Sequence, residues 1–345
     1  MHYVGTDNLN SGDILAKTIT GNSAGLMLIK GVALTDALIV RMKTHGIDIV
    51  CIEDNLETMT NDIISPSLRS EAVKSLKDVT SLLKNVVKPQ GNFVNVLEHI
   101  ITAIIHELTE NNINLGSMLD LKTHDNYTFE HSVNVAVLSL MTGMAMGYDY
   151  SKLKNVGIGA ILHDIGKTLI PVEILNNEGK LTADEFELIK RHPMLGYEKA
   201  KLALDIDPTG RSIILQHHEK INGTGYPFGK TETTIHEYAK IVAISDIYDA
   251  LTSDRPYRKR WPVKETLDLM TTLCETHIDT RIFNIFMSRI SPYPPGIKVL
   301  VSNGKVGFVL NNENRLRPLI GFTDGTVLDL SKVGNFNFYI REIVD

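Results

Sequence analysis

The feature that most constrains this chain is a histidine followed directly by an aspartate, His163-Asp164, where an apolar run gives way to a glycine. The run covers residues 156–162 and has the composition of a buried helix. One imidazole nitrogen can bind a metal ion, and a carboxylate has two oxygens that can bridge a pair of ions. The dipeptide alone is more often a helix end with a solvated aspartate, so the other histidines decide whether it marks a site.

Residues 118–290 are expected to be nearly all helical. Apolar residues recur on one side of residues 127–146, and a further helix begins at Ser151 and ends at the His163-Asp164 pair. Thr182 and Glu185 have the spacing of a capping box, which predicts a helix start. Helix bundles build metal sites in this way, because each helix delivers one ligand inward.

This helical segment carries histidines and aspartates that can be assembled into one cluster: His131, His163, Asp164, His192, His217, His218 and Asp246. One ion would take the first two histidines with Asp246, the other would take the remaining three histidines, and Asp164 would bridge. Imidazole with carboxylate suits iron, manganese or zinc better than calcium or magnesium. The absence of nearby cysteines disfavours a structural zinc or an iron–sulfur cluster.

Two divalent metal ions in such a cluster favour hydrolysis of a phosphate ester. A hydroxide between them would be the nucleophile, and their charge would stabilise the phosphoryl oxygens. The competing interpretation is that each histidine is an ordinary hydrogen-bonded helix residue. Adjacent His217 and His218 would even point about 100° apart on an ideal helix. That interpretation requires chance to supply the whole set.

The same segment carries short motifs in a fixed order: HSVNVA from His131, HDIGK from His163, GKLT from Gly179, His192-Pro193 with Gly196-Tyr197, HHE from His217, GYP from Gly225, and DIYDALTSDRPYR from Asp246. In order and spacing these motifs resemble the HD-GYP domain, a subgroup of the HD phosphohydrolase superfamily. The resemblance runs from residue 118 to about residue 285. It covers about half of the chain and implies an HD-type helical bundle.

The resemblance implies a phosphodiesterase that opens cyclic di-GMP to linear pGpG, or further to GMP, at a pair of iron or manganese ions. By position, the seven clustered side chains match the family's metal ligands, and Asp164 is the bridging, catalytic one. Lys167 matches a catalytic lysine that contacts the substrate phosphate or assists the leaving group. The substrate-binding residues implied in the same way are Lys167, Gly225, Tyr226, Arg255 and Arg258.

One position departs from the family's pattern. Members with a third metal ion have an acidic ligand four residues before the first histidine, where this chain has Tyr127. We therefore expect two ions, which puts the fuller hydrolysis to GMP in doubt. Asp249 lies one helical turn after Asp246 and is expected to orient a ligand.

The fold class expected for the whole chain is mainly α, with a smaller module at each end. Residues 1–54 have short β-like runs, one helical stretch and turn glycines, which predicts a small α+β module. Residues 55–117 are predicted to be connecting helices that could pair in a homodimer, followed by the HD-GYP segment over residues 118–290. In residues 291–345 the apolar period changes to two, with turn dipeptides at Asn303-Gly304 and Asp324-Gly325, which predicts a small antiparallel β unit.

Composition bears on partners and location. A formal net charge of −6 disfavours binding to duplex nucleic acid or to an anionic membrane, although a local basic cluster would serve a small anion such as cyclic di-GMP. The N-terminus lacks a signal-like apolar core, and no long uncharged apolar run occurs. We therefore expect a cytoplasmic protein that does not bind membranes.

Three alternatives stay open at this point. The same chemistry could act on another cyclic dinucleotide such as cyclic GMP-AMP, because no base-reading residue is evident. A receptor that binds cyclic di-GMP without cleaving it is the second, although the intact ligand set and Lys167 count against it. A di-iron oxygenase is the third, and the loop that contains Gly225, Tyr226 and Pro227 counts against it.

Overall fold

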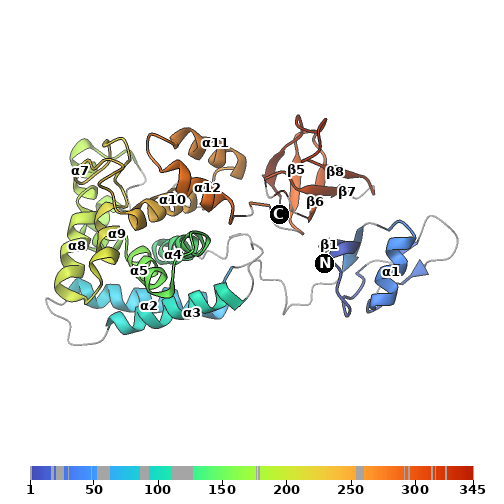
Figure 1. The fold of residues 1–345 in the computed structure, drawn as a ribbon, viewed down its shortest axis with the longest axis horizontal. Helices are drawn as coiled ribbons and strands as arrows, with labels where there is room; N and C mark the ends of the chain where they lie inside the picture. Colours follow the sequence, from blue (N-terminus) through green and yellow to red (C-terminus); the bar gives the residue numbers. More distant parts are fainter. Residues whose placement is uncertain are drawn as a thin grey trace. The chain divides into compact units, whose positions relative to one another are not determined.

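The structure is a computed structural model that describes residues 2–16, 19–20, 27–29, 31–47, 49–52, 63–85, 93–110, 127–175, 177, 179–253, 260–290, 292–293, 296–311, 314, 316–322 and 325–344. The chain divides into two compact units: residues 62–290, and residues 1–61 together with residues 291–345. The first unit is helical and the second contains the strands (Figure 1). The predicted fold class, mainly α with a small antiparallel sheet at the C-terminal end, is confirmed.

The helical unit contains α2 (Pro66–Asn85), α3 (Phe93–Glu110), α4 (Tyr127–Ala145), α5 (Tyr150–Ile161), η3 (Ile165–Leu169), α6 (Val172–Leu175), α7 (Ala183–Ile189), α8 (His192–Ala203), α9 (Pro208–Gln216), α10 (Glu237–Thr252), α11 (Val263–Leu273) and α12 (Thr280–Met287). Its central helix is α4, which packs against α2, α3, α5, α10 and α12 (Figure 1). Residues 130–143 are buried on every side of this helix. That burial is expected for a helix enclosed by others, and it places ligands carried by α4 inside the bundle.

Local sequence signals explain where several helices begin. Thr182 and Glu185 form the predicted capping box at the start of α7, which confirms that prediction. Asp149 caps α5 with its side chain. Helix α8 begins at His192, and Pro193 lies in its first turn. Proline fits the first helical turn, because its missing N–H would have no partner there.

The second unit combines the two ends of the chain. Its N-terminal part contains β1 (His2–Gly5), η1 (Thr6–Asn8), β2 (Ile19–Thr20), β3 (Met27–Leu28), α1 (Asp36–Thr44) and β4 (Ile49–Ile52). Its C-terminal part contains β5 (Lys298–Val301), β6 (Val306–Asn311), β7 (Leu319–Phe322), β8 (Val327–Asp329) and β9 (Ile340–Ile343). These five strands form an antiparallel sheet in the order β8-β7-β6-β5-β9. The sequence pattern did not indicate β1, which pairs with β4.

A direct hydrogen bond joins the two parts of this unit. The side-chain amide of Asn8 donates to the carbonyl oxygen of Leu310 at 2.6 Å, and β1 packs beside β6.

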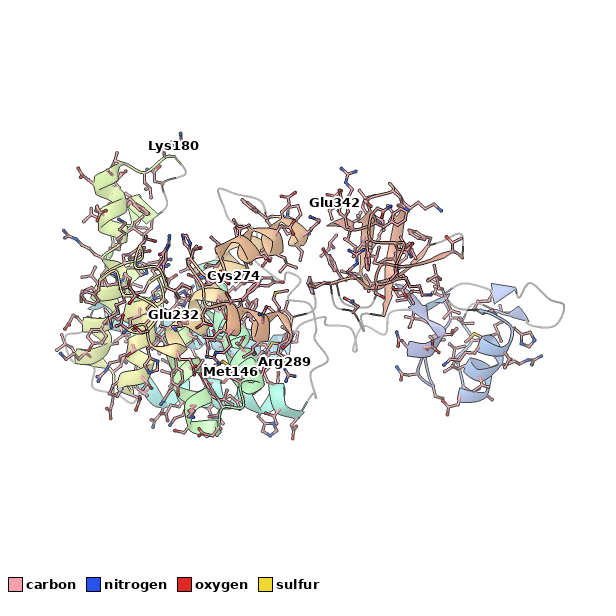
Figure 2. All side chains as sticks on the ribbon, turned by 45° about the horizontal axis from the view of Figure 1, so that its top comes forward. Met146, Lys180, Glu232, Cys274, Arg289 and Glu342 are labelled. Carbon is pink, nitrogen blue, oxygen red and sulfur yellow. The ribbon has the colours of Figure 1, made fainter. Side chains whose placement is uncertain are left out.

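The predicted boundaries at residues 54, 117 and 290 stay predictions. Polar side chains such as Lys180 on the helical unit and Glu342 on the sheet are exposed (Figure 2). Of the helices that the structure describes, none is sufficiently long and apolar to cross a membrane.

Candidate metal centre

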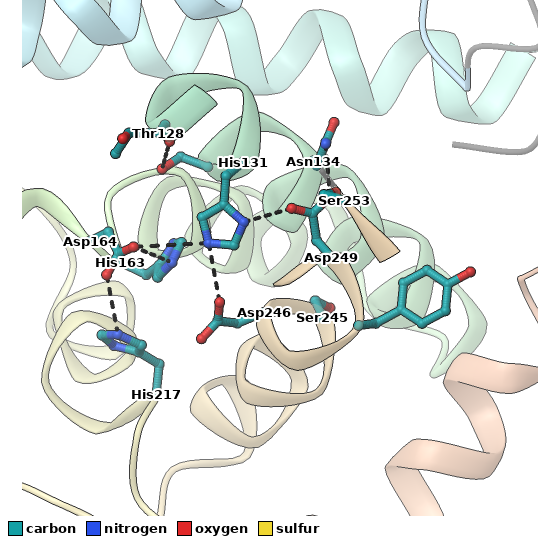
Figure 3. Close-up of polar contacts among 12 residues, drawn as sticks. Thr128, His131, Asn134, His163, Asp164, His217, Ser245, Asp246, Asp249 and Ser253 are labelled. Atoms are coloured by element: carbon teal, nitrogen blue, oxygen red, sulfur yellow. Dashed lines mark hydrogen bonds and ion pairs between the residues drawn. The ribbon is translucent and has the colours of Figure 1, made fainter. Parts of the chain in front are cut away.

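The structure brings together all seven side chains that the sequence singled out as metal ligands. His131 lies in α4, His163 and Asp164 follow α5, His192 begins α8, His217 and His218 follow α9, and Asp246 lies in α10. Figure 3 shows His131 at the centre of several of them, with Asp164 and Asp246 turned toward it. The candidate ligands therefore come from five helices or helix ends that meet inside the bundle.

One group of potential ligands contains His131, His163 and Asp164, whose ligand atoms lie within 4.8 Å of one another. Nε2 of His163 lies 3.3 Å from Oδ2 of Asp164, and Nε2 of His131 lies 3.9 Å from the same oxygen. Asp246 borders this group, because its Oδ1 lies 3.1 Å from Nε2 of His131. Two imidazoles and two carboxylates thus face one small volume.

A second group contains Asp164 again, with His192, His217 and His218, also within 4.8 Å of one another. Here Oδ1 of Asp164 lies 3.3 Å from Nε2 of His192 and 3.8 Å from Nε2 of His217. The two oxygens of Asp164 therefore face different groups of histidines. This is the geometry that a carboxylate needs to bridge two metal ions.

Backbone contacts orient three of the histidines toward the cluster. Nδ1 of His163 lies 2.8 Å from the carbonyl oxygen of Ala160, and Nδ1 of His192 lies 2.8 Å from the carbonyl oxygen of Ile189. Nδ1 of His217 lies 3.0 Å from the carbonyl oxygen of Ile214, near the end of α9. A carbonyl oxygen can only accept, so Nδ1 carries the hydrogen in each ring. Nε2 then presents a lone pair to the cluster, as metal-binding histidines require.

Two buried atoms of the cluster make no hydrogen bond: Nε2 of His163 and Oδ1 of Asp164. An unsatisfied buried acceptor costs about 1–3 kcal/mol. An ion at the first group would coordinate the nitrogen and an ion at the second group would coordinate the oxygen, and both donor types suit a transition metal. The residues present therefore fit a pair of divalent metal ions.

The carboxylates of the cluster are ionised. Burial alone would raise the pKa of Asp164, but the charge of Lys167 and the contacts with His163 hold that pKa well below its usual range. Burial likewise opposes ionisation of Asp246, and the hydrogen bond and charge of His131 outweigh it, so this pKa is also well below its usual range. Both carboxylates are thus ready to bind cations.

The imidazoles differ in charge. Burial lowers the pKa of His217 well below its ordinary value and lowers the pKa of His218 to about 3, so both rings are neutral. Burial also opposes protonation of His131, but its contacts with Asp246 and Asp249 outweigh burial and raise its pKa to about 9. Metal binding at His131 must therefore displace a proton.

Lys167 borders the cluster on a more exposed side. Its Nζ lies 2.6 Å from Oδ2 of Asp164, in an i,i+3 pair. Its side chain is 32% exposed, whereas that of Asp164 is 4% exposed. The ammonium can therefore meet a solvent-borne anion without leaving the site.

The loop around Tyr226 lies against the second group of histidines. The ring of Tyr226 is 4.7 Å from that of His218, and its N–H donates to the carbonyl oxygen of His218 at 3.2 Å. A Cβ on Gly225 would lie 2.3–2.6 Å from backbone atoms of residues 218–220, so this close approach requires glycine. The buried carboxylate of Glu219 accepts hydrogen bonds from the N–H groups of residues 228 and 230, at 2.8 Å each.

Glu219 was not predicted to have a role of its own. It follows His217 and His218 directly, and that adjacency is the one signal that could have indicated it.

The predicted substrate residues Arg255 and Arg258 lie outside the described residues.

Asp249 contacts a candidate ligand, as expected from its spacing. Its Oδ2 lies 2.6 Å from Nδ1 of His131, and its Oδ1 accepts hydrogen bonds from Asn134 at 2.8 Å and Ser253 at 3.1 Å (Figure 3). The sequence pattern did not single out Asn134. Its position three residues after His131 on the same helix is the signal that could have found it.

Comparisons with known proteins match the segment that contains these candidate ligands. The HD domain family matches residues 116–282. A cyclic di-GMP phosphodiesterase of Pseudomonas aeruginosa is 39% identical over 58% of this chain and 48% of its own length. A cyclic di-GMP phosphodiesterase of Borreliella burgdorferi is 28% identical over 65% of this chain and 62% of its own length. A 3′3′-cGAMP-specific phosphodiesterase of Vibrio cholerae is 29% identical over 52% of this chain and 41% of its own length.

These three matches span 41–62% of the relatives' own lengths. Among solved structures, an HDG"Y"P protein from Bdellovibrio bacteriovorus has a similar fold, with a TM-score of 0.55 and 19% identity over 83% of this chain and 98% of the other. The motifs, the helical fold and these matches lead to one conclusion. Residues 116–282 of this chain thus match the HD domain family, and the motifs within them resemble those of the HD-GYP subgroup.

Proposed function

We propose that this protein is a metal-dependent phosphodiesterase that hydrolyses cyclic di-GMP to linear pGpG. The observation that carries the proposal is the position of Asp164, whose two oxygens face two separate groups of histidines. Relatives named as cyclic di-GMP phosphodiesterases supply the substrate class.

The metal site of this proposal holds two divalent ions, iron or manganese. One ion would be held by His131, His163 and Asp246. The other ion would be held by His192, His217 and His218, and Asp164 would contact both ions. When bound, such a pair lowers the pKa of a shared water to produce a nucleophile and stabilises charge on phosphoryl oxygens. Metal supply and ligand type together decide which ion is bound.

The chain's own residues bind and orient the substrate. The Lys167 ammonium would attract a non-bridging phosphate oxygen or stabilise the leaving oxygen, because it carries a compact positive charge. Tyr226 lies beside His218 and would contact a guanine base or a phosphate of the substrate. Arg255 and Arg258 stay in the proposal as phosphate contacts on the basis of sequence alone.

The proposed reaction opens one phosphodiester bond of the ring. Water adds at phosphorus, the P–O3′ bond breaks, and the leaving oxygen takes a proton to become a 3′-hydroxyl. One such step gives pGpG. The absence of an acidic residue at position 127 supports two ions and therefore pGpG as the product, rather than GMP.

Cyclic GMP-AMP is the second candidate substrate. The relative from Vibrio cholerae named as specific for 3′3′-cGAMP shares 29% of its residues with this chain over 184 positions. Both dinucleotides present the same phosphodiester ring to the metal site, so the choice depends on base contacts.

Turnover of both dinucleotides by the manganese- or iron-loaded protein tests the proposal. We expect cleavage of cyclic di-GMP with pGpG accumulating, and a kcat/KM for 3′3′-cGAMP at least about tenfold lower, which corresponds to about 1.4 kcal/mol of discrimination. A metal-loaded protein that binds cyclic di-GMP without cleaving it would instead be a receptor. Preferred cleavage of 3′3′-cGAMP would reassign the substrate.

A further inference from the structure

A continuous line of hydrogen bonds leads from helix α2 to a candidate metal ligand. Nη1 of Arg69, in α2, donates to Oδ1 of Asn134 at 2.5 Å. Nδ2 of Asn134, in α4, donates to Oδ1 of Asp249 at 2.8 Å. Oδ2 of Asp249, in α10, lies 2.6 Å from Nδ1 of His131. Three helices are thus joined by side chains that end at His131.

The chemistry of these groups sets the direction of each bond. A guanidinium can only donate, so the oxygen of Asn134 must face Arg69 and its NH₂ must face Asp249. An ionised carboxylate can only accept, so Nδ1 of His131 carries the hydrogen toward Asp249. Nε2 of His131 is then the atom turned toward Asp246 and Asp164. Reversing any one link would leave two donors or two acceptors facing each other.

Burial makes these contacts costly to lose. Asn134 is 4% exposed and Asp249 is 3% exposed, so neither can replace a lost partner with bulk water. Ser253 also donates to Oδ1 of Asp249, at 3.1 Å. The Asp249 carboxylate is therefore held by Asn134 of α4 and by Ser253, which directly follows α10. The contact with Asn134 fixes the carboxylate relative to His131, because both residues lie in α4.

Arg69 lies outside the matched domain, which begins at residue 116. Helix α2 nevertheless packs against α4 and against η3, which carries Lys167. Its start is tied to α3, since Ser65 donates to the carboxylate of Glu107 through both its N–H and its hydroxyl, at 2.7 and 2.6 Å. The position of Arg69 is thus set by the helices that precede the domain.

We propose that Arg69 and Asn134 are positioning residues for His131. They hold Asp249 in the orientation that presents Nε2 of His131 to a metal ion, which makes helix α2 part of the support of the metal site. The inference rests on the two-metal site of the proposed function. It adds that the segment before the HD domain controls the affinity of one half of that site.

The two halves of the site should respond differently. The line of hydrogen bonds ends at His131, which belongs to the first group, whereas His192 and His217 are oriented by backbone carbonyls of their own region. Loss of outer partners of a ligand typically weakens metal binding by about 10–100-fold. We therefore expect one Mn²⁺ to bind that much more weakly while the other keeps nearly its original affinity.

The test is a Mn²⁺ titration of metal-free protein of residues 1–345 by isothermal titration calorimetry. Asn134→Asp keeps the size of the side chain but removes the donor to Asp249. Arg69→Met removes the charge and the donor, and Arg69→Lys keeps both. Ser139→Ala is the matched control, because Ser139 makes a buried hydrogen bond from α4 to Ser245 of α10 at 3.0 Å and contacts no candidate ligand.

The inference predicts selective loss of one Mn²⁺ site in Asn134→Asp and Arg69→Met, recovery to within about threefold in Arg69→Lys, and two sites as in the wild type for Ser139→Ala. Thermal unfolding would reveal whether Asn134→Asp fails to fold. In that case the two variants at the partly exposed Arg69, Arg69→Met and Arg69→Lys, still test the inference. Wild-type binding in both loss variants, or equal weakening of both sites, would overturn the inference and leave the proposed function intact. A wild-type chain that binds no metal would overturn both.

Discussion

The Nζ of Lys167 lies 2.6 Å from Oδ2 of Asp164, the carboxylate whose other oxygen faces the second group of histidines. A metal ion bound at this oxygen would share it with the ammonium. Lys167 is thus placed to act on a phosphate beside the metals without being a ligand itself, and the two roles can be separated by experiment.

Replacing Lys167 by alanine should slow turnover but retain metal. Removal of one electrostatic donor from a reaction site typically lowers kcat by about 10²–10³-fold. Metal content by inductively coupled plasma mass spectrometry should stay near the wild-type ratio, because the seven ligands are unchanged.

Lys190 provides the matched control for this change. It pairs with Glu187 at 2.6 Å with the same i,i+3 spacing, and its side chain is 31% exposed. Lys190→Ala should keep wild-type kcat. Equal kcat in the two alanine variants would remove Lys167 from the reaction, and loss of metal in the Lys167 variant would make it part of the metal site.

Gly225→Ala should damage substrate binding through the backbone. The added Cβ would lie 2.3 Å from the backbone nitrogen of Lys220 and 2.6 Å from the carbonyl oxygen of His218, so the loop that carries Tyr226 must shift. We expect kcat/KM to fall by at least about tenfold, or about 1.4 kcal/mol.

Gly179→Ala is the comparison for the glycine change. The nearest atom to its added Cβ is a side-chain oxygen of Asn177 at 3.1 Å, which can move. Its kcat/KM should stay within about twofold of the wild type. A Gly225 variant with the wild-type kcat/KM would show that the loop does not contact the substrate.

The metal-free protein should lose stability as the pH falls below about 6.5. In the unfolded chain a histidine titrates near pH 6.5. Burial lowers the folded-state pKa of His218 to about 3 and lowers that of His217 as well, so the unfolded state binds protons that the folded state does not. The free energy of unfolding should then fall by up to about 1.4 kcal/mol per pH unit for each such histidine.

Urea unfolding of the metal-free wild type and His218→Gln between pH 6.5 and 5 measures this dependence. His131, whose pKa is raised to about 9, is protonated in the folded state over this whole range, so it adds a slope of opposite sign near pH 6.5 that vanishes toward pH 5 and is the same in both proteins. The variant should have the shallower slope. Identical slopes would mean that His218 is protonated in the folded state near pH 6.

The sequence predicted the helical bundle and the clustered ligands because both depend on local signals. Apolar spacing marks helices, and motifs at helix ends mark ligands. The expected angle of about 100° between the side chains of His217 and His218 applies only where the helix continues through both residues. Helix α9 ends at Gln216, and the two rings lie 4.1 Å apart.

Contacts between distant segments could not be predicted in this way. The bond from Arg69 to Asn134 joins two helices whose relative rotation depends on core packing, not on either sequence. The bond from Asn8 to Leu310 spans 302 positions, and neither residue carries a motif. The sequence therefore indicated the candidate ligands but not the side chains that contact and orient them.

The most direct test of the two-metal account is the metal-to-protein ratio of the wild type and Asp164→Asn, prepared anaerobically with Fe²⁺ or Mn²⁺ and assayed on cyclic di-GMP. The carboxamide cannot bridge two ions as a carboxylate does, and metal ions supply several kcal/mol of transition-state stabilisation. We predict about two ions per wild-type chain, at most one in the variant, and a loss of cleavage of at least about 10³-fold. Two ions and full cleavage in Asp164→Asn would contradict the account.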